Sequence, residues 1–379
     1  MIPSKLPGFG TSIFTTMSQM AREYGALNLA QGFPDFEVSR TLVDTVYESM
    51  LQGKNQYAPS YGVPELQEVI AAMNKDLYGF EANAGEEVSV FTGATEALFA
   101  SISAIVADGD EVIIFDPAYD SYDPVVRFNK GKPIHINLSF PGFKIPWDEV
   151  EGKITAKTKA IIINNPHNPT GSVLAKEDLL VLERLVLKHG LFVISDEVYH
   201  NMIFDDRSHQ SVLAFPHLRT HAVAIFSFGK TLHATGWKVG YAVAPKAFTD
   251  EIRKLHQLLT FSVNTPVQYA LASFMQDKTN YALISKFFQS KRDFFLQKLE
   301  GSAFEPVKSE GTYFQVLAYD KISSSDDNQM ANKLVLEHGI ASIPISGFYQ
   351  DKTDHRMLRF CFAKNEETLS AAAKLLQSI

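Results

Sequence analysis

Short apolar segments alternate with longer amphipathic ones along most of this chain, and this alternation limits the folds open to it. Several of the short segments are apolar on both faces, which is typical of buried strands in a largely parallel sheet. The strand candidates are VSVFTG (88–93), EVIIFDP (111–117), KAIIINN (159–165), LFVISDE (191–197), AVAIFSF (222–228) and KVGYAVAP (238–245). Residues 94–107 and 176–190 have helical periodicity, and Gly190 is placed to end the second helix. The pattern predicts an α/β fold with a mostly parallel central sheet flanked by helices.

The pattern changes in the last third of the chain. Helices are expected over 266–276, 280–300, 327–338 and 366–378, with strands at GTYFQVL (311–317), around ASIPI and in RMLRFCFA. This mixture indicates an α+β unit, and 379 residues are enough for two domains. We predict a large domain over 36–275 and a smaller α+β domain made of 1–35 and 276–379.

Charge and composition argue against several classes of function. The net charge of −8 and the pI near 5.8 disfavour a nucleic-acid-binding surface, and no run of lysine or arginine occurs. No segment approaches the roughly 20 apolar residues of a membrane span, and the N-terminus has no apolar stretch of signal-peptide length. The single cysteine, Cys361, excludes an internal disulfide and fits a reducing compartment. We expect a cytoplasmic protein that binds neither nucleic acid nor membrane.

One histidine pair has the spacing of helical metal ligands. The segment HLRTH follows Pro216, runs into a predicted strand, and has no glutamate after His217. No other metal-ligand cluster stands out among the 11 histidines. We expect no metal site.

Polar residues follow several of the predicted strands, where open α/β sheets bind their ligands. In TGATEA, Gly93, Ala94 and Thr95 join a strand to a helix; they could receive a phosphate or only cap the helix. Asp196 directly follows an apolar strand, and could cap a helix or face a buried cation. Asn168, in NNPHNPTG, could present its amide to a ligand or serve only the turn.

Three cationic side chains lie in apolar surroundings. If RMLRFCFA is a strand, Arg359 shares a face with Met357 and Cys361. A guanidinium there needs a partner, either a structural carboxylate or the carboxylate of a substrate. Lys230 and Lys238 lie in SFGKTLHATGWKVGY, which is otherwise mostly small, aromatic or apolar. Most lysines are solvated surface charges, so a ligand role for these two needs further support.

The motifs, taken in their order along the chain, resemble those of one enzyme family. TGATEA, DPAYDSY, NNPHNPTG, ISDEVY, SFGKTLHATGWKVGY and RFCFAK are similar to the motifs of fold-type I pyridoxal-phosphate aminotransferases, over nearly the whole chain. LNLAQGFPDF, NQYAPSYGVPEL and GWKVG look like the branch that contains the kynurenine and methionine aminotransferases. The resemblance implies a transaminase that uses pyridoxal 5′-phosphate and acts on an amino acid and a 2-oxo acid.

The resemblance also implies a role for each residue around the cofactor ring. Lys230 is at the position of the lysine that forms a Schiff base with the cofactor and moves a proton between the substrate Cα and the cofactor C4′. Removal from water and nearby positive charge should lower its pKa. Asp196 would pair with the pyridinium nitrogen and keep the ring an electron sink. Tyr199 and Asn168 would bond the phenolic oxygen, and Tyr119 would stack on the ring.

The cofactor phosphate has its own set of implied ligands. They are Gly93, Ala94, Thr95, Ser227 and Lys238. Many members of the fold have arginine at the position of Lys238, whereas the kynurenine and methionine branch has lysine. Tyr57 matches a tyrosine that reaches the partner's phosphate across a dimer interface, which implies a homodimer with shared active sites.

By the same resemblance, Arg359 and Asn168 grip the substrate α-carboxylate close to the backbone at Gly32. No second arginine is evident for a side-chain carboxylate. The aromatic residues available to line the side-chain pocket are Phe14, Tyr61, Tyr119 and Phe348. This favours methionine, aromatic or similar uncharged L-amino acids as donors and leaves the 2-oxo acid open. A cysteine-conjugate β-lyase and a non-catalytic regulator with an aminotransferase-like domain are the alternatives.

Overall fold

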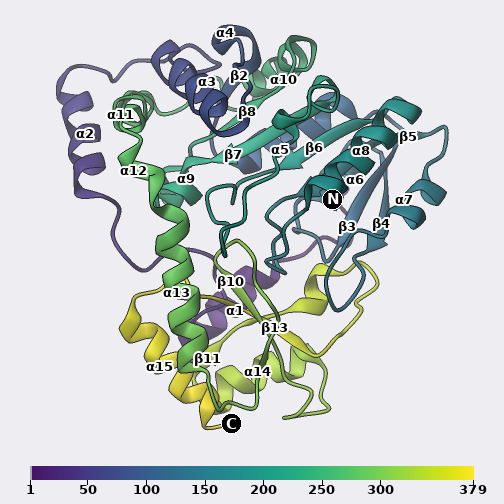
Figure 1. The fold of residues 1–379 in the computed structure, drawn as a ribbon, viewed down its shortest axis with the longest axis vertical. Helices are drawn as coiled ribbons and strands as arrows, with labels where there is room; N and C mark the ends of the chain where they lie inside the picture. Colours follow the sequence, from purple (N-terminus) through teal and green to yellow (C-terminus); the bar gives the residue numbers. More distant parts are fainter. Residues whose placement is uncertain (1) are drawn as a thin grey trace.

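The computed structural model describes residues 2–379 and contains a seven-stranded central sheet (Figure 1). In sheet order its strands are β2 (Val88–Phe91), β8 (Gly240–Val243), β7 (Ala222–Ser227), β6 (Phe192–Asp196), β5 (Thr158–Asn164), β3 (Glu111–Asp116) and β4 (Lys132–Asn137). Strand β8 runs antiparallel to both neighbours, β2 and β7, while all pairs from β7 to β4 are parallel. The predicted α/β fold with a mostly parallel sheet is confirmed.

Strand β4 is an element that the sequence did not predict. It lies at the edge of the sheet beside β3, and both of its end residues, Lys132 and Asn137, are exposed. An edge strand keeps part of its surface in water, so KPIHIN lacks the continuous apolar run that identifies the central strands.

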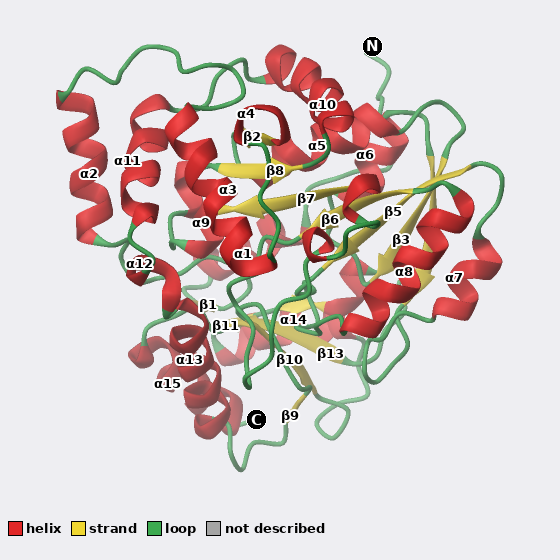
Figure 2. Ribbon diagram, turned by 45° about the horizontal axis from the view of Figure 1, so that its top comes forward, coloured by secondary structure: helices red, strands yellow, loops and turns green. Residues whose placement is uncertain are grey.

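Helices cover both faces of this sheet, as Figure 2 shows. The helices of this unit are α2 (Arg40–Leu51), α3 (Pro64–Tyr78), α4 (Ala84–Glu87), α5 (Ala94–Ile105), α6 (Tyr122–Phe128), α7 (Trp147–Lys153), α8 (Lys176–His189), α9 (Phe228–Thr231), α10 (Lys246–Leu259) and α11 (Thr265–Gln276), with 3-10 turns η1 (Val212–Ala214), η2 (Arg219–His221) and η3 (Thr235–Trp237). Alternate residues of β3 serve the two faces. Val112 and Ile114 pack in the core that contains α5, and Ile113 and Phe115 pack in the core that contains α3, α8 and α11.

A further hydrophobic core joins the two ends of the chain. Its strands are β1 (Leu27–Asn28), β9 (Glu305–Pro306), β10 (Phe314–Ala318), β11 (Ile340–Ala341), β12 (Ile343–Pro344) and β13 (Met357–Cys361), and its helices are α1 (Ile13–Glu23), α12 (Thr279–Ala282), α13 (Ile284–Lys298), α14 (Asp327–His338), α15 (Glu366–Gln377) and the 3-10 turn η4 (Ile345–Phe348). Strand β1 pairs in parallel with β11, so α1 lies among the C-terminal elements in Figure 1. The domain boundaries near residues 36 and 275 stay a prediction.

Two expected boundaries in this part differ from the structure. The helix expected over 280–300 is two helices, α12 and α13, which meet at Leu283. The strand expected from Gly311 begins at Phe314, because Thr312 has a φ of 68° and its N–H donates to the carbonyl of Met202, at 3.0 Å. The residues before Phe314 are thus bonded to the loop after β6 instead of to a neighbouring strand.

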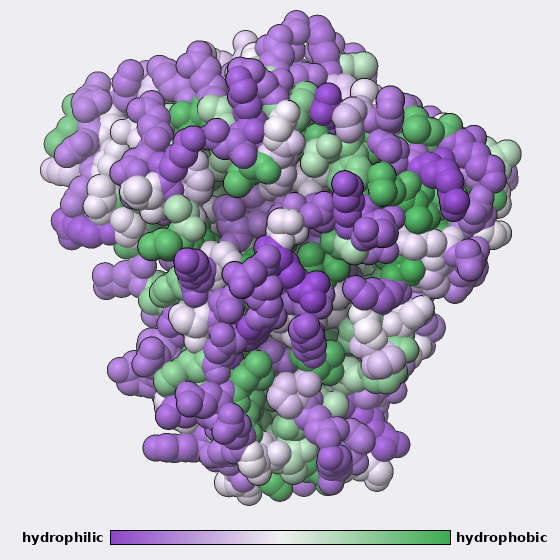
Figure 3. Space-filling model, viewed as in Figure 1, coloured by the Kyte–Doolittle hydropathy of each residue, from purple (hydrophilic) through white to green (hydrophobic). Residues whose placement is uncertain are grey.

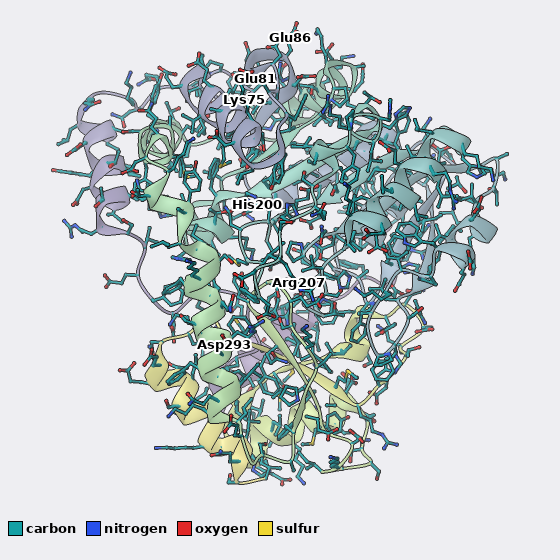
Figure 4. The ribbon with its side chains drawn as sticks, in the orientation of Figure 1. Lys75, Glu81, Glu86, His200, Arg207 and Asp293 are labelled. Carbon is teal, nitrogen blue, oxygen red and sulfur yellow. The ribbon has the colours of Figure 1, made fainter. Side chains whose placement is uncertain are left out.

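Ion pairs connect that same loop with the C-terminal elements. Arg292 Nη2 lies 2.6 Å from Asp205 Oδ1, and Arg207 Nη2 lies 2.8 Å from Glu310 Oε1. Figure 4 shows Arg207 midway down the molecule, between the sheet above and the C-terminal elements below. Both pairs therefore fasten the loop to the second core.

The surface is largely hydrophilic on the face shown in Figure 3. No helix within residues 2–379 is long and apolar enough to cross a membrane. The described chain also places no three His, Cys, Asp or Glu side chains where they could hold a metal ion together.

Candidate active site

A cavity of about 230 Å³ lies at the carboxyl ends of β5, β6 and β7 and at the start of α5. It brings together every residue that the sequence proposed for the cofactor, with the exception of Tyr57. These are Gly93, Ala94, Thr95, Tyr119, Asn168, Asp196, Tyr199, Ser227, Lys230 and Lys238. Because parallel strands end at the same edge, residues scattered through the sequence meet here.

Lys230, on the short helix α9 that follows β7, supplies an amine to this cavity. Its Nζ lies 2.8 Å from the hydroxyl of Tyr313. Burial is the main cause that lowers the pKa of Lys230 to about 8, and the cations of Arg359 and Lys238 lower it further. About a tenth of the amine is therefore neutral at pH 7, far more than for an ordinary lysine, and the neutral amine is the form that acts as a nucleophile or base.

Asp196, the last residue of β6, is a buried carboxylate without a cationic side chain in salt-bridge contact within residues 2–379. Its Oδ2 accepts a hydrogen bond of 2.6 Å from Tyr122, and its Oδ1 one of 3.3 Å from the N–H of Val198. Burial raises the pKa of Asp196 to about 6. The possible role as a helix cap is wrong, because the residues after β6 form turns and not a helix. A cationic ligand would stabilise this carboxylate.

The start of α5 and Lys238 form one end of the cavity. Gly93 caps the helix with φ 78° and ψ 163°, and a Cβ on it would lie 3.0 Å from Lys238 Nζ. Lys238 has a φ of 53°, a left-handed conformation, where the chain passes from the turn η3 to β8. The first N–H groups of α5 have no helical partner, so they and the ammonium group together favour an anion.

Arg359, in β13, is fully buried yet forms no salt bridge with any described carboxylate. Its Nη1 donates to Asn168 Oδ1 and its Nη2 to the carbonyl of Ala30, each at 2.8 Å, while its Nε has no partner. The guanidinium lies 3.8 Å from the ring centroid of Phe314. The structural ion pair allowed by the sequence is therefore wrong, and a ligand carboxylate would satisfy this group.

Phe14 and Phe348 stand close to the same guanidinium, with ring centroids 5.0 Å and 5.3 Å from it. Gly32 lies against Phe314, the ring that also packs on this guanidinium, and a Cβ there would lie 2.7 Å from Phe314 Cζ, so only glycine fits. The substrate residues expected from the sequence thus come close to Arg359.

Arg359, the aromatic rings around it and the neighbouring glycine do not line the cavity itself, and two more expected residues, Tyr61 and Tyr57, also lie outside it. Tyr61 packs beneath the guanidinium of Arg253, at 4.4 Å. Tyr57 is 82% exposed and touches Phe261 edge-on. Neither lines the cavity of its own chain.

Sequence reasoning missed two tyrosines that contact the proposed chemical groups. Tyr122, which hydrogen-bonds Asp196, lies within DPAYDSY, and its position next to a ligand motif was a usable signal. Tyr313, which contacts Lys230, lies in GTYFQVL, and nothing in that segment alone marks its hydroxyl. Its significance depends on a contact between distant parts of the chain.

The profile of class I and II aminotransferases matches residues 24–376. The chain belongs to this aminotransferase family. The methionine aminotransferase of Escherichia coli K12 is 46% identical over 381 aligned residues, which cover 100% of this chain and 99% of that one. The kynurenine–oxoglutarate transaminase of Dictyostelium discoideum is 36% identical, over 98% of this chain and 94% of that one.

Solved structures agree with the family assignment. The crystal structure of YbdL from Escherichia coli, described as identifying a methionine aminotransferase function, superposes with a TM-score of 0.98 at 46% identity and covers 100% of both chains. The N-succinyldiaminopimelate aminotransferase of Mycobacterium tuberculosis has a TM-score of 0.95 at 32% identity, also over 100% of both chains. This aminotransferase therefore has the fold-type I architecture, and members of its family depend on pyridoxal phosphate.

Proposed function

We propose that this aminotransferase binds pyridoxal 5′-phosphate through Lys230 and moves the amino group of methionine, aromatic or similar uncharged L-amino acids to a 2-oxo acid. The observation that carries the proposal is the Lys230 amine, with its pKa lowered to about 8, in a cavity between a buried carboxylate and an anion-binding end. The relatives described as methionine and kynurenine aminotransferases support this choice of donors.

The cavity has the chemical features that this cofactor needs. Lys238, Ser227 and the N–H groups at the start of α5 suit the phosphate. Asp196, without a salt bridge of its own, suits a protonated ring nitrogen, and Tyr122 fixes its orientation. The ligands proposed for the phenolic oxygen are Tyr199 and Asn168, and Tyr119 is the residue proposed to stack on the ring.

Bound pyridoxal phosphate would supply an aldehyde for the Lys230 amine and an electron-accepting ring next to the substrate Cα. Neutral Lys230 acts first as the nucleophile that attaches the cofactor. Once displaced by the amino acid, the free amine would take the proton from Cα and deliver it to the cofactor C4′, on the other side of the substrate nitrogen. The protein thus moves the proton with a single group.

The substrate carboxylate would occupy the free side of Arg359. Asn168 accepts a hydrogen bond from Nη1, whereas Nε has no partner and is available to a ligand oxygen. The aromatic side chains of Phe14 and Phe348 favour an apolar substrate side chain. Burial raises the pKa of Asp120, and the nearby guanidinium of Arg359 offsets part of that rise. A carboxylate there disfavours acidic donors such as aspartate.

We further propose a cytoplasmic homodimer that shares its active sites. Tyr57, Leu258 and Phe261 are exposed apolar or aromatic side chains, at 82%, 84% and 48%. A second copy that covers this surface would place Tyr57 at the phosphate of its partner. The exposed position of Tyr57 therefore fits a role outside its own cavity.

The test is the absorbance of the purified protein with pyridoxal phosphate. We expect a band near the boundary of the violet and visible regions in the wild type and in Lys75→Ala, a surface lysine variant, but none in Lys230→Ala. The loss of that band is then measured with a panel of amino donors and 2-oxo acids. An unchanged band in Lys230→Ala would contradict the lysine assignment.

The same preparation distinguishes the proposed function from the second candidate, a cysteine-conjugate β-lyase. A lyase releases pyruvate and ammonia from the conjugate with no 2-oxo acid present, whereas transamination requires the acceptor. Acceptor-independent release faster than transamination of methionine would favour the lyase.

A further inference from the structure

The reacting amine has a neighbour to which the proposed function gives no role. Tyr313 is completely buried, and its hydroxyl lies 2.8 Å from Lys230 Nζ. The same hydroxyl lies 2.6 Å from the carbonyl oxygen of Gly32. Its ring packs edge-on against Tyr199, with the centroids 5.2 Å apart. The phenol is therefore held by packing against its ring and by two hydrogen bonds at its hydroxyl.

The direction of these two hydrogen bonds follows from the number of protons. A neutral phenol has one proton, and a carbonyl oxygen can only accept, so the proton of Tyr313 points to Gly32. Burial raises the pKa of Tyr313 well above its ordinary value, so the phenol stays neutral. Tyr313 can then only accept from Lys230, and the amine must give one of its N–H bonds to it. The lone pair of the neutral amine consequently points away from Tyr313.

The acceptor that holds the phenol proton is itself held in place. A Cβ on Gly32 would lie 2.9 Å or less from two ring atoms of Phe314, so the backbone there lies directly against that side chain. Just before it, the carbonyl of Leu29 accepts from the N–H of Cys361 at 2.7 Å, and the carbonyl of Ala30 accepts from Arg359 at 2.8 Å. The carbonyl of Gly32 is thus held in a fixed position next to the proposed carboxylate site.

We propose that Tyr313 is a positioning residue for the aminotransferase reaction, which holds the Lys230 amine with its lone pair directed into the cavity. The inference rests on the proposed function. In the proton transfer the neutral amine takes the hydrogen of Cα as a proton and becomes an ammonium, and the electrons of the broken C–H bond stay with the carbon. The ammonium would then give up the same proton to the cofactor C4′, on the other side of the substrate nitrogen. Tyr313 neither gains nor loses a proton at any point.

Without this hydroxyl, the lysine side chain keeps its reach but loses the bond that fixes its rotation. Misplacement of a reacting group by a small distance lowers rates by about 10- to 100-fold. The affinity for the amino acid depends on Arg359 and Asn168, which Tyr313 does not contact through hydrogen bonds. We therefore expect a loss in rate with little change in substrate affinity.

Tyr313→Phe is the direct test, and Tyr319→Phe is its matched control. Tyr319 is equally buried, and its hydroxyl donates to the backbone carbonyl of Ser325 at 2.9 Å, away from the cavity. Two quantities are measured: the rate at which the apoenzyme captures pyridoxal phosphate covalently, and the isotope effect on turnover with an α-deuterated amino donor. For Tyr313→Phe we expect capture slowed by about 10- to 100-fold and a larger isotope effect. Tyr319→Phe should match the wild type in both.

The outcomes separate the inference from the proposed function. Wild-type rates of capture and a wild-type isotope effect in Tyr313→Phe would overturn the inference and leave the function intact. Failure of the wild type to capture pyridoxal phosphate would overturn the function itself. If Tyr313→Phe does not fold, Tyr313→Met replaces the ring with a flexible apolar chain and faces the same two measurements.

Discussion

Replacement of Gly93 by alanine tests whether the start of α5 and Lys238 form the phosphate site. Gly93 has φ 78° and ψ 163°, a conformation that is essentially restricted to glycine. Any other residue there is strained by about 1–3 kcal/mol. The new Cβ would also lie 3.0 Å from Lys238 Nζ and 3.1 Å from its Cε, so the end of that side chain must shift by a few tenths of an ångström.

The two effects have different magnitudes and different readouts. Backbone strain should lower the free energy of unfolding of the apoenzyme by about 1–3 kcal/mol, measured with urea. The shift of Lys238 weakens its proposed hydrogen bond to the cofactor phosphate, and the whole of such a bond to a charged group contributes about 1.5–3 kcal/mol. Affinity for pyridoxal phosphate should therefore fall, by up to about 100-fold, measured by absorbance titration.

Gly79→Ala is the control that separates strain from the site. Gly79 ends α3 with a φ of 68°, and a Cβ there would meet no atom within 4 Å. Its alanine variant should lose about 1–2 kcal/mol of stability and no cofactor affinity. The reasoning is refuted if Gly93→Ala binds pyridoxal phosphate as tightly as Gly79→Ala does.

Two further predictions concern a buried ion pair and the dimer. Burial opposes the charge on His135, but hydrogen bonds of 2.9 Å to both Asp116 and Asp123 raise its pKa to about 9. The resulting stabilisation, about 3 kcal/mol, is complete below about pH 6.5 and is lost as the pH rises through 9. His135→Gln should then cost most of that amount in urea unfolding at pH 6 and little at pH 10; an equal cost at both would contradict the assignment. Inactive Tyr57 and Lys230 variants should regain some activity when mixed, and no recovery despite demonstrated subunit exchange would argue against shared sites.

The sequence predicted those parts of the molecule in which local pattern and structure coincide. Strands such as β5 and β6 are continuous apolar runs because both of their faces are buried, and their ends carry the ligands because parallel strands end together. The edge strand β4 was missed because its exposure removes that pattern. The late start of β10 was missed because the left-handed Thr312 depends on a bond to a distant loop.

The site was predicted as a set of residues, and its hydrogen bonds were not. Asp196, Asn168 and Lys230 stand next to recognisable motifs, so their positions could be proposed from sequence. The bond between Tyr313 and Gly32 joins residues separated by 281 positions, and that between Tyr313 and Lys230 spans 83. Such contacts exist only in the folded chain, and no local pattern records them.

The two parts of the proposed site are built on different cores. Asp196 ends a strand of the central sheet and Lys230 follows one, whereas Phe14 and Arg359 belong to elements of the core that joins the chain ends. The bond of 2.8 Å between Arg359 and Asn168 crosses from one to the other. The packing of the two cores against each other therefore sets the distance between Arg359, proposed to bind the amino acid, and the residues proposed to bind the cofactor. A slight loosening of the packing between the cores would separate the amino acid from the cofactor while both cores stay folded. Catalysis is therefore more sensitive to this interface than folding is.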